Sequence, residues 1–388
     1  MDRISRFKLV EETKKIFKSR FSVDPAHTSS APGRINIIGE HTDYNLGLAM
    51  PVGINRWVCA SISHRVDSQI HVFSKNFNKS LQLDLIGNIE TTDLWEKYIV
   101  GILSVVKQRF NIKFGFNMLL YGNVPIGAGV SSSAALEVAI LGSIKELYQL
   151  SITTNEFLDI CSKVDNDYVG VKSGMLDQYV SLLSDKQGPM LIDFSKSSHK
   201  NLKFSLKKEN FILINSLVDR KLARSDYNVR VKECREALEL INSKLDQSKK
   251  IYEIDCEDLN YLDRHSIHYK RLYHVVTENQ RVYKLLSAIK EGNINMVGKI
   301  LSYSHKSLSE NYEVSCNEIE SIIKVSNYAP GFYGGRIMGG GFGGCTVNLV
   351  DSDRLEEFES YVHYHLCSKY SLNVKIERVE FSDGLKSH

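Results

Sequence analysis

The chain has 388 residues, of which 43% are hydrophobic and 24% charged, a composition typical of a soluble globular protein with two or three domains. Its formal net charge is only +3, so no basic field favours nucleic acid or an anionic membrane. The apolar runs are too short for a membrane span, and the N-terminus lacks a signal-peptide pattern. Seven scattered cysteines without a Cys-x-x-Cys pair disfavour zinc and disulfides, so we expect a reduced, cytoplasmic compartment.

The first polar cluster of the chain follows an amphipathic helix that we predict over residues 6–20. A turn at Pro32 and Gly33 leads into a predicted short strand over residues 35–38. Within eleven residues the sequence then gathers six polar or ionisable side chains, namely Arg34, Asn36, Glu40, His41, Asp43 and Tyr44. They fit either a solvated loop or a pocket wall that binds the hydroxyl groups of a sugar.

Two aromatic residues stand near the start of the next predicted helix, which begins at residue 94 and ends at about residue 110. It follows two predicted strands, residues 57–63 and 69–74, that alternate apolar and polar side chains. Trp95 and Tyr98 are three residues apart and therefore share one helical face. They are either core aromatics, which is the commoner case, or a stacking surface for a base.

A glycine-rich loop with a run of serines spans Pro125 to Glu137. A predicted strand over residues 116–121 precedes it, and apolar residues at helical spacing follow it. Glycines allow close approach to a ligand, and the first turn of a helix offers free N–H groups that suit phosphate. The serine hydroxyls could cap the helix or bind magnesium. The alternative is an ordinary helix start.

A lone carboxylate, Asp177, lies between Leu176 and Val180 in an otherwise apolar segment after a predicted helix over residues 155–169. A buried carboxylate needs a cation or hydrogen-bond donors to stay ionised. Asp177 is therefore a candidate catalytic base, or else a helix cap or part of a structural ion pair. A predicted strand over residues 190–194 follows, and we place the boundary between two halves in the polar, lysine-rich residues 195–208.

The second half contains another glycine-rich segment, residues 334–345, that leads directly into a predicted strand over residues 346–350. Gly339 to Gly344 formally matches G-x-G-x-x-G, but a dinucleotide-binding loop opens a helix instead. The protein-kinase and Walker signatures are absent from the sequence. The other predicted elements are a strand over residues 211–215, helices to about 245 and over 270–290, 293–308, 317–327 and 355–370, and a strand over 374–381.

These motifs together resemble the galactokinase family of the GHMP small-molecule kinases, nearly from end to end. Gly33 to Tyr44 looks like the galactokinase signature, which is highly specific. Pro125 to Ala135 looks like the phosphate loop of the family, and Arg336 to Gly344 like its third, C-terminal loop.

The resemblance implies transfer of the γ-phosphoryl group of ATP to the anomeric hydroxyl of α-D-galactose, which gives galactose 1-phosphate and ADP. It implies that Asp177 is the base and that Arg34 keeps Asp177 ionised and stabilises the transferring charge. The implied contacts to the sugar are Glu40, His41, Asp43, Gly174 and Tyr227. The implied ATP site is Gly127, Ala128, Gly129, Val130, Ser131, Ser132 and Ser133 around the phosphates, with Trp95 and Tyr98 at the adenine. The implied ligands of Mg²⁺ are Ser133 and Asp165.

The resemblance also implies an α+β fold of two lobes with the active site in the cleft between them. We expect residues 1–200 to form the N-terminal lobe, with a left-handed βαβ unit, and residues 201–388 a ferredoxin-like C-terminal lobe. The departures from the family pattern include Asp165, which replaces a glutamate, and Met338, which stands where a threonine is usual. The implied partners are galactose and ATP only, without nucleic acid or membrane, and the implied state is a monomer.

Two other functions are compatible with the motifs. One is a different sugar 1-kinase, such as an N-acetylgalactosamine kinase, because the pocket at the 2-position of the sugar cannot be read from sequence. The other is a non-catalytic sensor of galactose and ATP. Such sensors lack a Ser-Ala pair in the serine run, whereas Ser131 to Ala135 is intact here.

Overall fold

The computed structural model describes residues 4–85, 91, 93–110, 112–170, 174–204, 206–218 and 223–388. Within this part of the chain, a six-stranded sheet has the strand order β13-β1-β3-β6-β4-β5. Its pairs are antiparallel except β4 with β6, which is parallel. The strands are β1 (His27–Asn36), β3 (Pro51–His64), β4 (Gln69–Ser74), β5 (Lys79–Asp84), β6 (Phe116–Gly122) and β13 (Lys386–Ser387).

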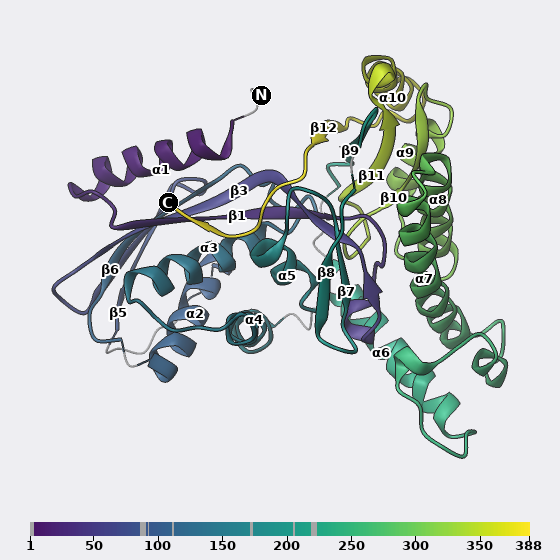
Figure 1. Ribbon diagram of the computed structural model, residues 1–388, viewed down its shortest axis with the longest axis horizontal. Coiled ribbons are helices and arrows are strands. Elements are labelled where there is room, and N and C mark those ends of the chain that lie inside the picture. The colour runs from purple at the N-terminus through teal and green to yellow at the C-terminus, as the bar shows by residue number, and fades with distance from the viewer. Residues whose placement is uncertain are drawn as a thin grey trace.

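Helices cover both faces of this sheet (Figure 1). The helix α1 (Arg6–Phe21) packs on one face, where Leu9 and Val10 form an apolar cluster with Trp57 and Cys59. The other face carries α2 (Leu94–Phe110), α3 (Ser132–Leu147), α4 (Thr154–Lys163) and α5 (Leu176–Leu183). These bounds confirm the predicted helices near residues 6–20 and 94–110. The helix expected over 155–169 is α4 followed by a π-helical turn, Val164–Val169.

A small three-stranded sheet contains β2 (Leu48–Ala49), β7 (Met190–Asp193) and β8 (Ser198–Asn201). Strand β8 lies inside the polar segment 195–208, for which we predicted no strand. All four of its residues are exposed, so it lacks the apolar alternation that reveals a half-buried strand.

The second half is built on a four-stranded antiparallel sheet in the order β10-β11-β9-β12. With the intervening helices this is the βαββαβ arrangement of a ferredoxin-like fold, which confirms that expectation. The strands are β9 (Glu209–Asn215), β10 (Phe332–Ile337), β11 (Cys345–Asp351) and β12 (Lys375–Val379). The helices are α6 (Ala223–Asn242), α7 (Ile267–Lys290), α8 (Ile294–Glu310), α9 (Asn317–Ser326) and α10 (Leu355–Tyr370).

The two halves of the chain are joined by a shared strand pairing and by a shared apolar core. The terminal strand β13 returns to the first sheet and pairs with β1 (Figure 1). The largest apolar core likewise joins residues of both halves, for example Phe116 and Phe211. Among the described helices, none is both long and apolar enough to cross a membrane.

Candidate active site

The predicted catalytic pair meets in space although 143 residues separate its members. Arg34 lies in β1, and Asp177 lies in the first turn of α5. Arg34 Nε and Nη2 both lie 2.8 Å from Asp177 Oδ1. Arg34 Nη1 donates to the carbonyl of Gly129 at 2.6 Å. One guanidinium thus fixes the carboxylate and the phosphate-loop backbone relative to each other.

The serine-rich loop contacts the same carboxylate from its other side. Ser131 adopts a left-handed φ of 59° directly before α3, and its hydroxyl donates to Asp177 Oδ2 instead of capping the helix. Gly33 packs so closely that an added Cβ would lie 2.6 Å from the carbonyl of Val130. The N-terminus of α3, with its free N–H groups, is therefore held beside Asp177.

A polar cavity of about 220 Å³ opens in front of the pair. It contains all five predicted sugar contacts together with both predicted catalytic residues. Its lining is Arg34, Asn36, Gly39, Glu40, His41, Asp43, Gly174, Leu176, Asp177, Tyr227, Asn228, Gly339 and Gly340. Sequence segments from both halves of the chain thus converge on one site.

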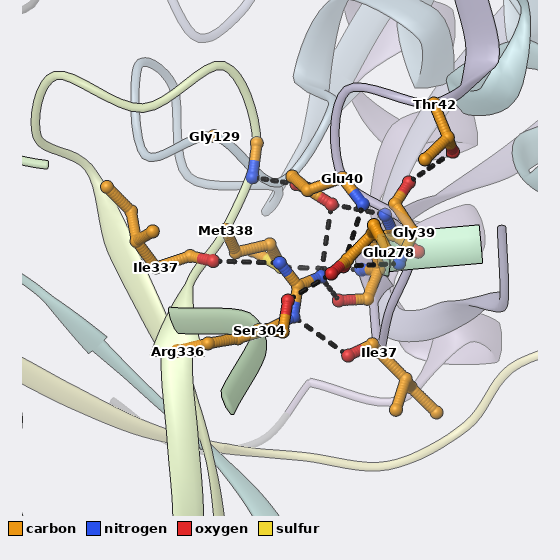
Figure 2. Close-up of polar contacts among 12 residues, drawn as sticks. Ile37, Gly39, Glu40, Thr42, Gly129, Glu278, Ser304, Arg336, Ile337 and Met338 are labelled. Atoms are coloured by element: carbon orange, nitrogen blue, oxygen red, sulfur yellow. Dashed lines mark hydrogen bonds and ion pairs between the residues drawn. The ribbon is translucent and has the colours of Figure 1, made fainter. Parts of the chain in front are cut away.

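A buried ion pair ties the third glycine loop to the signature segment (Figure 2). Arg336 is fully buried, and its Nη2 lies 3.0 Å from Glu40 Oε2. Its Nε also donates to the carbonyl of Ile37 at 2.8 Å, and Gly339 donates its N–H to Glu40 Oε1. Met338, the departure noted above, accepts the N–H of Asn36 on its sulfur at 3.4 Å.

The buried carboxylate of Glu278, in α7, accepts hydrogen bonds from the same signature segment (Figure 2). Its Oε1 accepts the N–H of Gly39 at 3.0 Å and the Ser304 hydroxyl at 2.7 Å, while Arg281 contacts Oε2. Burial alone would raise the pKa of Glu278, but the charge of Arg281 lowers it to about 2. The backbone at Gly39, which lines the cavity, is therefore held by the ionised carboxylate of Glu278.

Asp43 and Gly174 fit closely against each other. A Cβ on Gly174 would lie 2.0 Å from Asp43 Oδ2, so only glycine leaves that carboxylate in place. Burial and, next, the charge of Asp177 raise the pKa of Asp43 from 3.8 to about 7. The charge of Asp177 thus opposes the ionisation of Asp43 across the cavity.

Aromatic rings enclose His41 at the far side of the cavity. The ring centroids of Tyr312 and Tyr227 lie 4.7 and 5.5 Å from that of His41. The Nδ1 atom contacts the Tyr44 hydroxyl at 2.8 Å, whereas Nε2 has no hydrogen-bond partner among the described residues. Burial, followed by the nearby His274 and Arg230, lowers the pKa of His41 well below 6.5.

A second, more apolar cavity of about 390 Å³ lies on the other side of the serine run. Trp95 and Tyr98 line it, as do Ser132 and Ser133 at the start of α3. Phe77 stacks on Trp95 with ring centroids 6.1 Å apart. Such a slot with a helix N-terminus at one end suits a flat base that carries phosphates.

The predicted metal ligand Asp165 belongs to a buried acidic cluster. Gln178 Nε2 donates to Asp165 Oδ2 at 2.7 Å and to Glu137 Oε2 at 3.1 Å. Burial and then the charge of Asp165 raise the pKa of Glu137 well above its usual value. No group of three metal-ligating side chains is preformed among the described residues. Even so, buried carboxylates joined by a neutral amide fit an environment that gains from a divalent cation.

Sequence reasoning missed several residues of this site. Sequence patterns alone place Arg336 only in a glycine-rich loop and indicate no role for Glu137 and Tyr312. A charged residue between apolar neighbours, as at Glu137, is a usable signal for burial with a partner. Nothing in the local sequence pairs Tyr312 with His41, since 271 positions separate them.

Comparisons with known proteins agree with this geometry. The model described as "Galactokinase galactose-binding signature" matches residues 15–64. The models described as "GHMP kinases N terminal domain" and "GHMP kinases C terminal" match residues 97–185 and 285–366. The first match contains the Arg34–Tyr44 segment, and the second contains both the phosphate loop and Asp177.

Whole-chain similarity extends over both halves. A galactokinase of Staphylococcus carnosus is 32% identical over 97% of this chain and 99% of its own length. One of Thermosipho africanus is 34% identical over 92% and 98%. The solved structure of Lactococcus lactis galactokinase complexed with galactose superposes with a TM-score of 0.91 at 29% identity, covering 97% and 99%. The chain therefore belongs to the galactokinase family of the GHMP kinases, and it is an ATP-dependent sugar kinase with galactokinase activity.

Proposed function

We propose that Asp177 receives the proton of the anomeric hydroxyl of galactose while that oxygen attacks the γ-phosphorus of ATP. The new O–P bond forms as the bond from phosphorus to the bridging oxygen breaks, and ADP leaves with that electron pair. The observation that carries this assignment is the Arg34–Asp177 pair, situated between a polar cavity and the serine-headed helix. Arg34 pairs with the Asp177 carboxylate, and its charge also lies near the transferring group.

We assign the sugar to the polar cavity. Glu40, Asp43 and Asp177 offer carboxylate oxygens to hydroxyl protons, and His41 and Tyr227 line the same space. Gly174 makes room for Asp43. The Lactococcus lactis relative, whose structure was solved in complex with galactose, supports galactose as the ligand.

We assign the nucleotide to the apolar cavity and the loop beside it. Trp95 and Tyr98 would contact the adenine, and the backbone of Gly127, Ala128, Gly129, Val130, Ser131, Ser132 and Ser133 would surround the phosphates. Phosphoryl transfer needs mainly positioning and charge neutralisation, so this light set of groups is sufficient.

Ser133 and Asp165 would hold Mg²⁺, which supplies positive charge against the phosphates when bound. The acidic cluster of Asp165 and Glu137 favours a cation at that place. The aspartate, one methylene shorter than the family's glutamate, would reach the ion through water. The division into lobes at residue 200, the monomeric state and the cytoplasmic location stay predictions from the sequence.

The test is ADP release measured with galactose and with N-acetylgalactosamine, for the wild type and for Asp177→Ala and Asp177→Asn. Galactose is expected to be the substrate. Both variants are expected to lose at least ~10³-fold in kcat, because neither can accept a proton. An Asp177→Asn variant with most of the wild-type rate would show that Asp177 only positions the hydroxyl. Circular dichroism and thermal unfolding control for folding.

The same assay examines the competing functions. Turnover of N-acetylgalactosamine but not galactose would replace the assigned substrate. Tight binding of galactose without ADP release would contradict an enzymatic role.

A further inference from the structure

The two oxygens of the Asp177 carboxylate are held by different partners. Arg34 Nε donates to Oδ1 at 2.8 Å, and Arg34 Nη2 lies 2.8 Å from the same oxygen. The guanidinium therefore does not form the fork in which each nitrogen contacts its own carboxylate oxygen. In the described part of the chain, the donor to Oδ2 is the hydroxyl of Ser131. Because the terminal torsion of an aspartate has a broad energy minimum, this second contact is what fixes the carboxylate plane.

The three serines of the phosphate loop face different surroundings. Ser132 and Ser133 are half-buried and line the apolar cavity. Ser131 is buried and is not among the described residues that line either cavity. Its side chain also makes no capping hydrogen bond to α3. The backbone of Ser131 can therefore border the phosphates while its hydroxyl is committed to the carboxylate.

The backbone of the loop directs the Ser131 side chain. Its φ of 59° lies in the left-handed region, which is unfavourable for a residue other than glycine. Such a conformation persists where surrounding contacts fix it. Here the carbonyl of Gly129 accepts from Arg34 Nη1 at 2.6 Å, and the carbonyl of Val130 accepts the N–H of Arg34 at 3.1 Å. Three consecutive loop residues thus contact either Arg34 or Asp177.

The contacts also distinguish the two oxygens of Asp177 as proton acceptors. Each carboxylate oxygen has two lone pairs. Two guanidinium nitrogens lie against Oδ1, whereas Oδ2 accepts from Ser131 and keeps a lone pair. The side chain of Asp177 is 31% exposed and lines the polar cavity. A proton on Oδ1 would face the positive guanidinium, so Oδ2 is the better acceptor.

We propose that Ser131 is a positioning residue of the reaction, which orients Asp177 Oδ2 to receive the proton of the anomeric hydroxyl. The proton moves to Oδ2, and the electron pair of the broken O–H bond stays on the anomeric oxygen, which bonds to phosphorus. This inference rests on the proposed function. It gives the Ser131 hydroxyl a role other than the phosphate binding that its place in the loop suggests.

Two substitutions separate the hydroxyl from the backbone strain. Ser131→Ala removes the hydroxyl and keeps the unfavourable φ, whereas Ser131→Gly removes both. Both are expected to lower kcat about 10- to 100-fold, with KM for galactose and for ATP changed less than about threefold, because the base is misplaced. Ser131→Gly should melt at a higher temperature than Ser131→Ala, since alanine is disfavoured at positive φ. A merely structural role would make kcat follow the melting temperature instead.

The chain offers a matched control at Ser371, which follows α10. It is exposed and has a similar left-handed φ of 51°. Ser371→Gly should likewise melt at a higher temperature than Ser371→Ala. Both Ser371 variants should keep the wild-type kcat, because this serine lies outside the site.

Titration calorimetry with ADP and Mg²⁺ tests the phosphate role without turnover. Ser131→Ala is expected to bind ADP with wild-type affinity, since its backbone N–H is retained. Ser133→Ala, which alters a residue that lines the apolar cavity, is expected to bind ADP more weakly. Weaker ADP binding by Ser131→Ala would contradict the assignment of its hydroxyl to Asp177.

A double-mutant cycle tests whether Ser131 acts through Asp177. Adding Ser131→Ala to Asp177→Asn should lower the residual kcat by less than about twofold, because the group that Ser131 orients has already lost its function. A further loss as large as in the wild-type background would mean that Ser131 acts elsewhere, and it would overturn the inference.

The inference and the proposed function fail in different ways. If Asp177→Asn loses activity while Ser131→Ala keeps the wild-type kcat, only the role of Ser131 is wrong. The same holds if Ser131→Gly restores the kcat that Ser131→Ala loses. If Asp177→Asn itself keeps the wild-type rate, the proposed role of Asp177 is wrong, and the inference that depends on it is wrong as well.

Discussion

The polar cavity and the apolar cavity beside the serine run are organised in opposite ways. In the polar cavity, charged side chains are fixed by partners distant in sequence, as in Arg34 with Asp177 and Glu40 with Arg336. The apolar cavity is lined mainly by residues between Val58 and Leu136, with Trp95 and Phe77 stacked at its wall. Phosphoryl transfer needs preorganised charge, whereas a flat base needs mostly shape and apolar contact. The comparison therefore predicts that substitutions in the two cavities have different consequences.

The largest effect is expected where the polar cavity depends on a buried ion pair. Arg336→Met leaves the Glu40 carboxylate buried without its cation and should lower the free energy of unfolding by about 3–5 kcal/mol. Urea unfolding measures this loss. Adding Glu40→Gln to Arg336→Met removes the uncompensated charge and should recover part of the stability. Equal stability of the single and double variants would mean that the loss does not come from the uncompensated charge of Glu40.

A smaller, purely local change tests how closely the polar cavity is fitted. Gly174→Ala places a methyl group against Asp43 and must move that carboxylate. Displacement of a positioning group by about 1 Å costs up to ~10²-fold, so kcat/KM for galactose should fall by that order. KM for ATP should be unaffected. A matching loss for both substrates would contradict the separation of the two cavities.

The apolar cavity should respond more weakly and only toward ATP. Trp95→Leu keeps apolar volume but removes a ring that could stack on a base, a contact worth about 1–3 kcal/mol. KM for ATP is expected to rise about 10-fold, with KM for galactose unchanged. The other tryptophan provides the control, because Trp57 is equally buried but packs against α1. If Trp57→Leu has the same effect on KM for ATP, the change is not specific to the cavity.

The smallest effect is a pH dependence of stability that comes from Asp43. Its pKa is about 7 in the folded chain and 3.8 as the ordinary value, so between these pH values the folded state binds more protons than the unfolded state. Stability contributed by the protonated carboxyl is therefore lost as pH rises from about 4 to 7. Asp43→Asn should remove this slope and change the melting temperature by a few degrees relative to the wild type across the window.

Asp177→Asn sharpens the same measurement. Without the charge of Asp177, the second cause of the raised pKa of Asp43, the slope should end at a lower pH. Identical melting profiles for wild type and Asp43→Asn between pH 4 and 7 would contradict the electrostatic coupling of the two carboxylates.

Local sequence determined the elements and the chemical inventory of this protein. Apolar spacing of 3.6 residues predicted α1 and α2 to within a residue, and the glycine and serine pattern located the start of α3. The signature Gly33 to Tyr44, the phosphate loop Pro125 to Ala135 and the C-terminal loop Arg336 to Gly344 identified the family before any coordinates. These features can be predicted from sequence because each depends on residues within about one helical turn or one strand.

Tertiary structure alone decided how those groups meet. Ser131 donates to Asp177 instead of capping its own helix, and Arg336 pairs with Glu40 from 296 positions away. The exposed strand β8 left no apolar pattern to find. Burial and pairing across long stretches of chain depend on the packing of both halves, so local sequence carries no record of them.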